Sequence, residues 1–164
     1  MIREVAGDIL LSKAQLIAHG VAAGDHFDTG LALSLRERWP AMVKDFRHYC
    51  HTKHPKPGTL WVWSGADATR IACLITQEEA PAKHLHPGPA RVEYVEHAVH
   101  ALRDLVEAEG IKSLALPKLS TGVGGLSWDV VLPILQKHLG KLDIPVWVYS
   151  TYKQSVAANE LAAV

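Results

Sequence analysis

The chain has 164 residues, a length that suits one domain with its own hydrophobic core and leaves little room for a second. Its 17 basic and 17 acidic residues give a formal net charge of zero, which disfavours binding to bulk nucleic acid through phosphate contacts. The two cysteines, Cys50 and Cys73, lack the spacing of a zinc site or a redox pair, and we expect no cofactor or metal. Without a signal-peptide pattern or an apolar run long enough to cross a membrane, we expect a cytoplasmic protein with no membrane partner.

Short apolar runs alternate with helical patterns from one end of the chain to the other. Strand patterns fall at residues 2–5, 16–21, 59–63, 70–76, 113–116 and 144–149, and helical patterns at 31–39, 40–50, 92–109 and 127–139. The clearest of these is the helix over 92–109, whose apolar stripe ends at Gly110. Such alternation is typical of an α/β sandwich with a largely parallel sheet.

Three loops near the ends of predicted strands carry most of the glycine and polar residues of interest. They cover residues 7–12, 18–30 and 119–126. In parallel α/β sheets, ligands bind beyond the carboxyl ends of the strands. We therefore expect the three loops to converge on one crevice.

The loop over 119–126 reads Leu-Ser-Thr-Gly-Val-Gly-Gly-Leu and precedes a helix that Ser127 can cap. Its glycines let backbone amides approach an anion such as a diphosphate, and the helix adds its positive end. The segment has neither the Walker A lysine nor the GxGxxG order, and a simple strand–helix turn is the alternative interpretation. After the first strand, Asp8 can accept a hydrogen bond from an adenine amino group, with a turn or cap role as its alternative.

Four segments resemble motifs of the macro domain family in matching order. They are Gly7-Asp8-Ile9, Ala18-His19-Gly20-Val21, Thr29-Gly30-Leu31-Ala32 and the stretch from Leu116 to Trp128. The resemblance extends over residues 3–150 and is greatest to the branch that contains the terminal ADP-ribose protein glycohydrolase and the antitoxin that removes ADP-ribose from DNA. It implies a three-layer α/β/α domain over residues 1–154, with a mixed, largely parallel sheet of about six strands, followed by a C-terminal tail at 155–164.

The same resemblance implies a binding site for ADP-ribose. Its residues would be Asp8, Ile9, His19, Gly20, Val21, Ala22, Gly30, Leu119, Ser120, Thr121, Gly122, Val123, Gly124, Gly125, Tyr149 and Tyr152. Asp8 would hold the adenine amino group, and backbone amides between Ser120 and Gly124 would hold the diphosphate and the distal ribose. For the two tyrosines, an adenine contact and core packing both remain open.

The chain departs from this branch at its catalytic positions. Gln77 stands where the branch has a nucleophilic lysine, and Gly124 where it has an acid–base aspartate, so the covalent route is closed. Candidates for activating water at the distal ribose are Asp25, His26 and Asp28. Lys83 is a further candidate if its loop folds inward.

Three functions follow from these residues. The preferred one is an ADP-ribosyl hydrolase that releases ADP-ribose from a modified protein, nucleic acid or small molecule, with a modified base able to enter the cleft. The second is a non-catalytic ADP-ribose reader, which Gln77 and Gly124 favour. The third is a different nucleotide-phosphate enzyme on a related scaffold.

Overall fold

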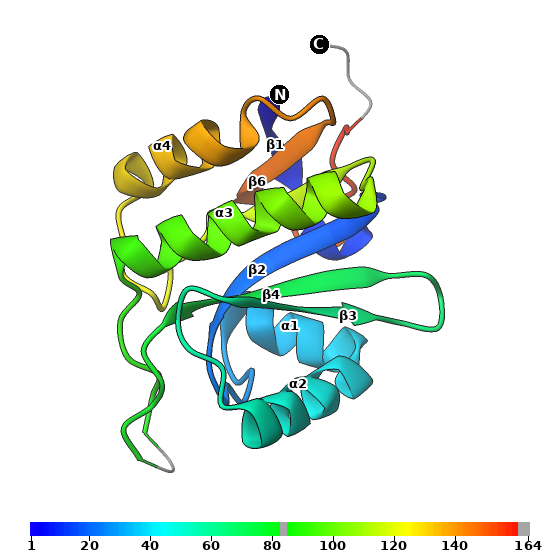
Figure 1. The fold of residues 1–164 in the computed structure, drawn as a ribbon. Helices are drawn as coiled ribbons and strands as arrows, with labels where there is room; N and C mark the ends of the chain where they lie inside the picture. The colour runs from blue at the N-terminus through cyan, green and yellow to red at the C-terminus, as the bar shows by residue number, and fades with distance from the viewer. Residues whose placement is uncertain (83–84, 161–164) are drawn as a thin grey trace.

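The computed structural model describes residues 1–82 and 85–160, and within them six strands form one sheet in the order β1-β6-β5-β2-β4-β3 (Figure 1). The strands are β1 (Ile2–Gly7), β2 (Leu16–Ala22), β3 (Leu60–Ser64), β4 (Arg70–Gln77), β5 (Leu114–Pro117) and β6 (Val146–Tyr152). Neighbouring strands run parallel, except that β3 pairs antiparallel with β4. The expected mixed, largely parallel sheet is confirmed.

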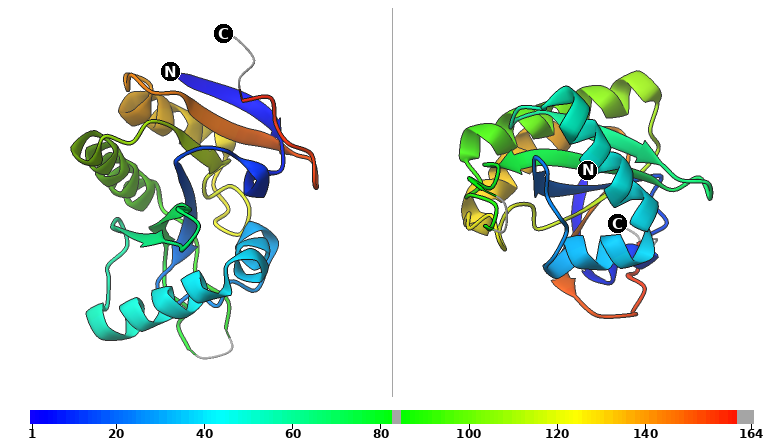
Figure 2. Two further views of the ribbon diagram at one scale, coloured as in Figure 1. Left: turned by 90° about the vertical axis from the view of Figure 1, so that its right-hand side faces the viewer. Right: turned by 90° about the horizontal axis from the view of Figure 1, so that it is seen from below.

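Helices cover both faces of this sheet (Figures 1 and 2). One face carries α1 (Gly30–Arg38) and α2 (Pro40–Lys53), and the other carries α3 (Val92–Glu109) and α4 (Trp128–Leu139). A short 3-10 helix, η1 (Ile9–Leu11), follows β1. The molecule is thus the three-layer α/β/α domain that the resemblance implies.

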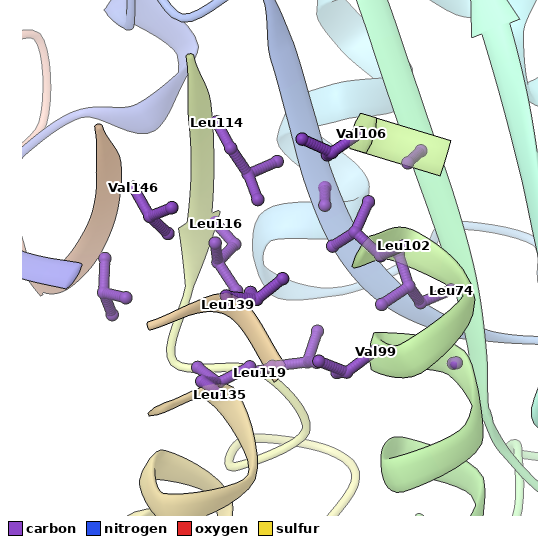
Figure 3. Close-up of a cluster of buried hydrophobic side chains, with 14 of the residues drawn as sticks. Leu74, Val99, Leu102, Val106, Leu114, Leu116, Leu119, Leu135, Leu139 and Val146 are labelled. Carbon is purple, nitrogen blue, oxygen red and sulfur yellow. The ribbon is translucent and has the colours of Figure 1, made fainter. Parts of the chain in front are cut away.

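The apolar stripe of α3 forms the centre of one core, as its spacing predicts. Val95, Val99, Leu102 and Val106 are buried against the sheet, where they meet leucines of β5 and α4 (Figure 3). The second core, on the face covered by α1 and α2, is richer in aromatic rings. In it Phe27 lies edge-on to Phe46, with ring centroids 5.7 Å apart.

Two elements, β6 and α2, end three residues later than expected. Strand β6 begins at Val146, directly after Pro145, and continues to Tyr152 because its last residues pair with the end of β1. This extension carries Tyr152 to the edge where the parallel strands end. Helix α2 continues past Cys50 to Lys53, and His54 ends it in a left-handed conformation with a φ of 47°. None of the helices in the described residues is both long and apolar enough to cross a membrane.

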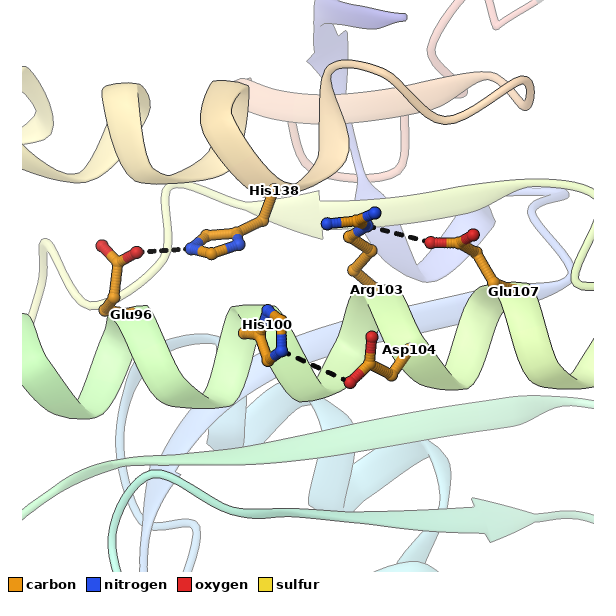
Figure 4. Close-up of polar contacts among 6 residues, drawn as sticks. All are labelled: Glu96, His100, Arg103, Asp104, Glu107 and His138. Atoms are coloured by element: carbon orange, nitrogen blue, oxygen red, sulfur yellow. Dashed lines mark hydrogen bonds and ion pairs between the residues drawn. The ribbon is translucent and has the colours of Figure 1, made fainter.

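Polar contacts tie α3 to α4 on the outer face of the molecule (Figure 4). The carboxylate of Glu96 accepts a hydrogen bond from Lys137 Nζ at 2.9 Å and lies 2.5 Å from Nε2 of the buried His138. These two contacts, that of Lys137 first, lower the pKa of Glu96. The cluster belongs to the helix pair opposite α1 and α2, so we assign it to helix packing rather than to ligand binding.

Candidate functional site

A cavity of about 400 Å³ opens at the edge where β1, β5 and β6 end, a volume within the range of small-molecule sites. Its lining residues are Gly7, Asp8, Ile9, Gly30, Leu31, Ser34, Pro117, Tyr149 and Tyr152. The expected loops at 7–12 and 18–30 both contribute to it. The loop over residues 119–126, called the glycine loop below, does not line the cavity. It is connected to it through Pro117, the lining residue at the end of β5 that leads into the loop.

Asp8 lines the cavity with a carboxylate that two backbone amides already hold. Its Oδ1 accepts a hydrogen bond from Leu10 N–H at 3.0 Å, which caps η1, and its Oδ2 accepts one from Ser155 N–H at 3.0 Å. Only 7% of the residue is exposed. Each carboxylate oxygen offers about two acceptor positions, so this group can still receive an amino group in the cavity. The cap role therefore does not exclude the predicted ligand role.

The two tyrosines of β6 occupy different positions in the cavity wall. Tyr149 is buried, and its hydroxyl donates a hydrogen bond of 2.5 Å to Glu160 Oε2. Burial, followed by this bond, raises the pKa of Tyr149. Tyr152 is 64% exposed and lies at the rim. Tyr149 thus combines core packing with a place in the wall, whereas Tyr152 offers an exposed ring to a ligand.

The glycine loop presents a row of backbone amides. In the described residues, no carbonyl or side chain accepts a hydrogen bond from the amides of Gly122, Val123 and Gly124. Ser120 holds a left-handed φ of 61°, and its carbonyl accepts a hydrogen bond from Leu126 N–H at 3.0 Å, which closes the loop. Successive amides in a turn of this kind form a concave anion site.

The side chains around the loop anchor it to the sheet. Leu119 is fully buried in the core, and Ser120 Oγ donates a hydrogen bond to Thr76 Oγ1 at 2.9 Å. Thr121 Oγ1 donates to Lys118 O at 2.8 Å. Gly125 holds a φ of 79°, a conformation that favours glycine. The predicted loop residues therefore divide into anchoring side chains and free amides.

Strand β2 passes beneath this loop and carries four predicted contact residues. A Cβ on Gly20 would come within 2.8 Å of Thr76 Oγ1, so glycine is required for this close approach. Val21 and Ala22 are buried in the strand. His19 is 2% exposed, and its Nε2 lies 3.2 Å from Cys73 Sγ in the core. A ligand contact at this position would therefore come from its backbone, and the predicted role of His19 in the site stays a prediction.

Burial also makes His19 an unsuitable base. Desolvation lowers its pKa to about 4, so the imidazole is neutral near pH 7. Its neighbour Cys73 is equally buried, and desolvation raises the pKa of that thiol well above its usual value. The pair is therefore a neutral packing contact rather than a catalytic one.

The acidic residues proposed to activate water hold the loop between β2 and α1. Asp25 accepts hydrogen bonds from two backbone amides, those of Phe27 at 2.8 Å and Ala22 at 3.3 Å. Asp28 forms a 2.7 Å ion pair with Arg36 at the surface. His26 is exposed, and its carbonyl accepts a bond from the same Arg36. Within the described residues, the His26 side chain forms no hydrogen bond or ion pair, and Asp28 has an exposed carboxylate.

Gln77 and Gly124, which stand where the resembled branch has its catalytic lysine and aspartate, have structural roles in this chain. Gln77 is buried and donates a hydrogen bond to Gly88 O at 3.2 Å. A Cβ on Gly124 would come within 2.7 Å of Ser120 O and 2.9 Å of Ala90 Cβ. An aspartate therefore cannot replace Gly124 without movement of the loop. Lys83, the remaining catalytic candidate, lies outside the described residues.

Sequence reasoning missed several residues around the cavity. Leu31 and Ser34 line it from α1, and their spacing of three on a predicted helix was an available signal. Pro117 lines it from the end of β5. Glu160 is bonded to Tyr149 and lies in a tail for which no function was expected. No local pattern marks it, because its other partners, Ser12 and Lys13, lie near the opposite end of the chain.

Comparison with known proteins gives the same assignment of fold and family. The Macro domain model matches residues 22–135. A DNA ADP-ribosyl glycohydrolase of Thermus aquaticus is 27% identical over 91% of this chain and 41% of its own length. The structure described as the macrodomain of Thermus aquaticus DarG is 28% identical with a TM-score of 0.79, and covers 92% of this chain and 98% of that one.

A second solved structure carries a ligand. It is described as Thermosipho africanus DarTG in complex with ADP-ribose, is 25% identical with a TM-score of 0.78, and covers 95% of this chain and 42% of that one. The chain spans less than half the length of the first curated relatives it matches. Because the family model covers well over half of the chain and the same fold recurs in these structures, the chain belongs to the Macro domain family.

Proposed function

We propose that this Macro domain binds ADP-ribose, with the adenine in the cavity beside Asp8 and the diphosphate on the amides of the glycine loop. The observation that carries this proposal is the adjacency of two complementary features. A cavity lined by a buried carboxylate and an exposed tyrosine suits a purine, and it adjoins a loop with three consecutive free amides in the described residues. The ADP-ribose complex of the Thermosipho africanus relative supports the same ligand.

Calorimetry with ADP-ribose tests the binding proposal. In a thermal unfolding experiment, a ligand at one hundred times its dissociation constant adds about 2.7 kcal/mol to the free energy of unfolding. The absence of both binding heat and stabilisation at millimolar ADP-ribose would contradict the proposal. Stabilisation by a different nucleotide alone would favour the third hypothesis, an enzyme acting on other nucleotide phosphates.

The Asp8→Asn variant tests the adenine contact. It replaces one acceptor oxygen by an amino group, so the affinity for ADP-ribose should fall by about 1–3 kcal/mol, the value of a hydrogen bond to a charged group. Asp143→Asn is the matched control, because it removes the same charge from an exposed residue in the turn before β6. Equal affinity of both variants and the wild type would remove Asp8 from the site.

A second function, hydrolysis of an ADP-ribose linkage, is favoured by the relatives named DNA ADP-ribosyl glycohydrolase. We propose a water-activated route, since Gln77 and Gly124 supply neither a nucleophile nor an acid–base group. Among the described residues, Asp28 and His26 carry exposed side chains that make no contact with a backbone amide, and we propose these two for water activation at the distal ribose. Incubation with ADP-ribosylated DNA, ADP-ribosylated glutamate peptides and ADP-ribose esters tests it. Release from none of the three classes would leave the chain as a reader.

A further inference from the structure

After β6 the chain turns back and runs beside β1 and η1, as the red segment in Figure 2 shows. We name residues 153–160 the C-terminal strap. Its backbone follows the end of β1: Lys153 N–H donates to Gly7 O at 3.1 Å, and Asp8 N–H donates to Val156 O at 2.7 Å. Packing is close enough that a Cβ on Gly7 would lie 2.7 Å from Ala158 N. The strap is therefore fitted against the first strand.

The strap also binds two side chains of the cavity wall. Ser155 N–H donates to Asp8 Oδ2 at 3.0 Å, and Glu160 Oε2 accepts the 2.5 Å hydrogen bond from the Tyr149 hydroxyl. The Glu160 carboxylate further accepts bonds from Ser12 Oγ at 2.5 Å and Lys13 N–H at 3.0 Å. Glu160 thus joins β6 to the segment that follows η1.

Polar contacts rather than apolar burial hold the strap in place. Most of its residues are exposed, and Ala158 is its one residue that packs on the described core as a partly buried apolar side chain. Arg3 Nη2 adds bonds to Asn159 O at 2.7 Å and Glu160 O at 2.9 Å. Since bonds to Asp8 and Tyr149 are part of what docks the strap, a docked strap in turn fixes the orientation of these two groups.

A docked strap leaves the cavity open. The described residues that line the cavity come from elsewhere in the chain, and the space of about 400 Å³ is present while the strap is bound. The strap bonds to Asp8 without lining the cavity, and it takes up only one acceptor position of Oδ2. The arrangement prepares the carboxylate in one orientation, which reduces the entropy lost on binding.

We propose that the C-terminal strap is part of the adenine subsite, with Ser155 and Glu160 as positioning residues that set the preference for adenine. This inference rests on the proposed binding of ADP-ribose. The ligand contact is made by Asp8, and the strap acts through it. Selectivity between adenine and hypoxanthine is the relevant property, because the two bases differ at the amino group that the carboxylate would receive.

Two substitutions at Ser155 separate the role of its amide from that of its side chain. Ser155 has a φ of 58°, which glycine adopts freely and proline cannot. Ser155→Gly keeps the N–H donor and relieves the backbone, whereas Ser155→Pro removes the donor and prevents the conformation. Glu160→Ala releases the strap at its other end, and Glu160→Gln keeps an acceptor for Lys13 N–H.

The experiment is calorimetry of each folded variant with ADP-ribose and with its hypoxanthine analogue. Ser155→Pro and Glu160→Ala should each lower the affinity for ADP-ribose about tenfold, the equivalent of one hydrogen bond to a charged group, with little change for the analogue. Ser155→Gly should keep the wild-type preference, and Glu160→Gln should restore part of it. A role in stability alone would lower the unfolding temperature and leave the preference unchanged.

The outcomes distinguish this inference from the proposed function. Wild-type protein that fails to bind ADP-ribose contradicts both. Wild-type binding with an unaltered base preference in Ser155→Pro and Glu160→Ala contradicts the strap alone. Should Ser155→Pro not fold, Glu160→Ala decides the question by itself.

Discussion

The two ends of the candidate cleft use their polar groups differently. At the proposed adenine end, Asp8 is held by two backbone amides and still has acceptor positions open to a cavity. At the distal end, between β2 and α1, Asp25 also accepts hydrogen bonds from two backbone amides, which hold its carboxylate within its own loop. Gln77 is bonded to a carbonyl of the neighbouring loop, and Gly124 occupies a space too small for a side chain.

This difference separates what the domain can bind from what it can catalyse. Groups that recognise a ligand can be bonded to the protein on one side and open on the other. A general base, in contrast, needs an unoccupied acceptor at the reacting atom. The distal end retains such a group in the exposed carboxylate of Asp28 and the exposed imidazole of His26.

The largest effect on the free energy of unfolding should come from lowering the pH, because His19 is buried. Its ring centroid lies 5.6 Å from that of Phe27, in the loop between β2 and α1. Burial lowers the pKa of His19 to about 4 in the fold, against an ordinary value of 6.5. The unfolded chain therefore binds a proton that the folded chain does not, and stability that is complete above pH 6.5 is lost as the pH falls towards 4. The loss from this group should reach about 3 kcal/mol, at 1.36 kcal/mol for each pH unit.

Denaturant titrations of the wild type and His19→Gln between pH 7 and pH 4 measure this contribution. The glutamine amide can still contact Cys73 but does not titrate, so the variant should lose less stability over this range than the wild type. Other carboxylates titrate equally in both proteins and cancel in the difference. Parallel curves for the two proteins would show that His19 is not buried in its neutral form.

Gly124→Ala should have the next largest effect, because its methyl group would collide with Ser120 O. The free energy of unfolding should fall by about 1–3 kcal/mol, the usual result of overpacking. Gly122→Ala is the matched control in the same loop, since its Cβ meets no atom within 4 Å. Thermal unfolding compares the two. Equal stability of the two variants would mean that the loop can move to accept a side chain, and that the fold does not exclude an aspartate at position 124.

The fold and the order of its elements could be predicted because their signals are local. The stripe of Val95, Val99, Leu102 and Val106 has the period of a helix, and Gly110 ends it where expected. The glycine loop and Asp8 could be identified by residue type and by their place after strands. Helical spacing could also have added Leu31 and Ser34 to the cavity.

The remaining features depend on contacts that no local pattern records. Strand β2 is buried on both faces, so alternation does not show that His19 faces the core. Glu160 acts on Ser12, 148 positions away, and Asp8 is bonded to Ser155, 147 positions away. The hydrogen bonds of Asp25 lie within its own loop, but an acidic residue next to a glycine is equally compatible with a catalytic base and with a turn residue. Only the geometry distinguishes the two.

The smallest effect on stability should follow Asp28→Asn, and this makes it the most informative test of catalysis. The Asp28–Arg36 pair is exposed, with side chains 66% and 42% accessible, so its loss should change stability by no more than about 0.5 kcal/mol. Asp25→Asn is the contrasting variant: it disturbs two backbone contacts and should cost about 1–2 kcal/mol. If Asp28 activates water, its variant should lose ADP-ribose release while keeping both its stability and its affinity for ADP-ribose. A loss of release in Asp25→Asn alone, in step with its loss of stability, would instead report a damaged loop and leave Asp28 outside the chemistry.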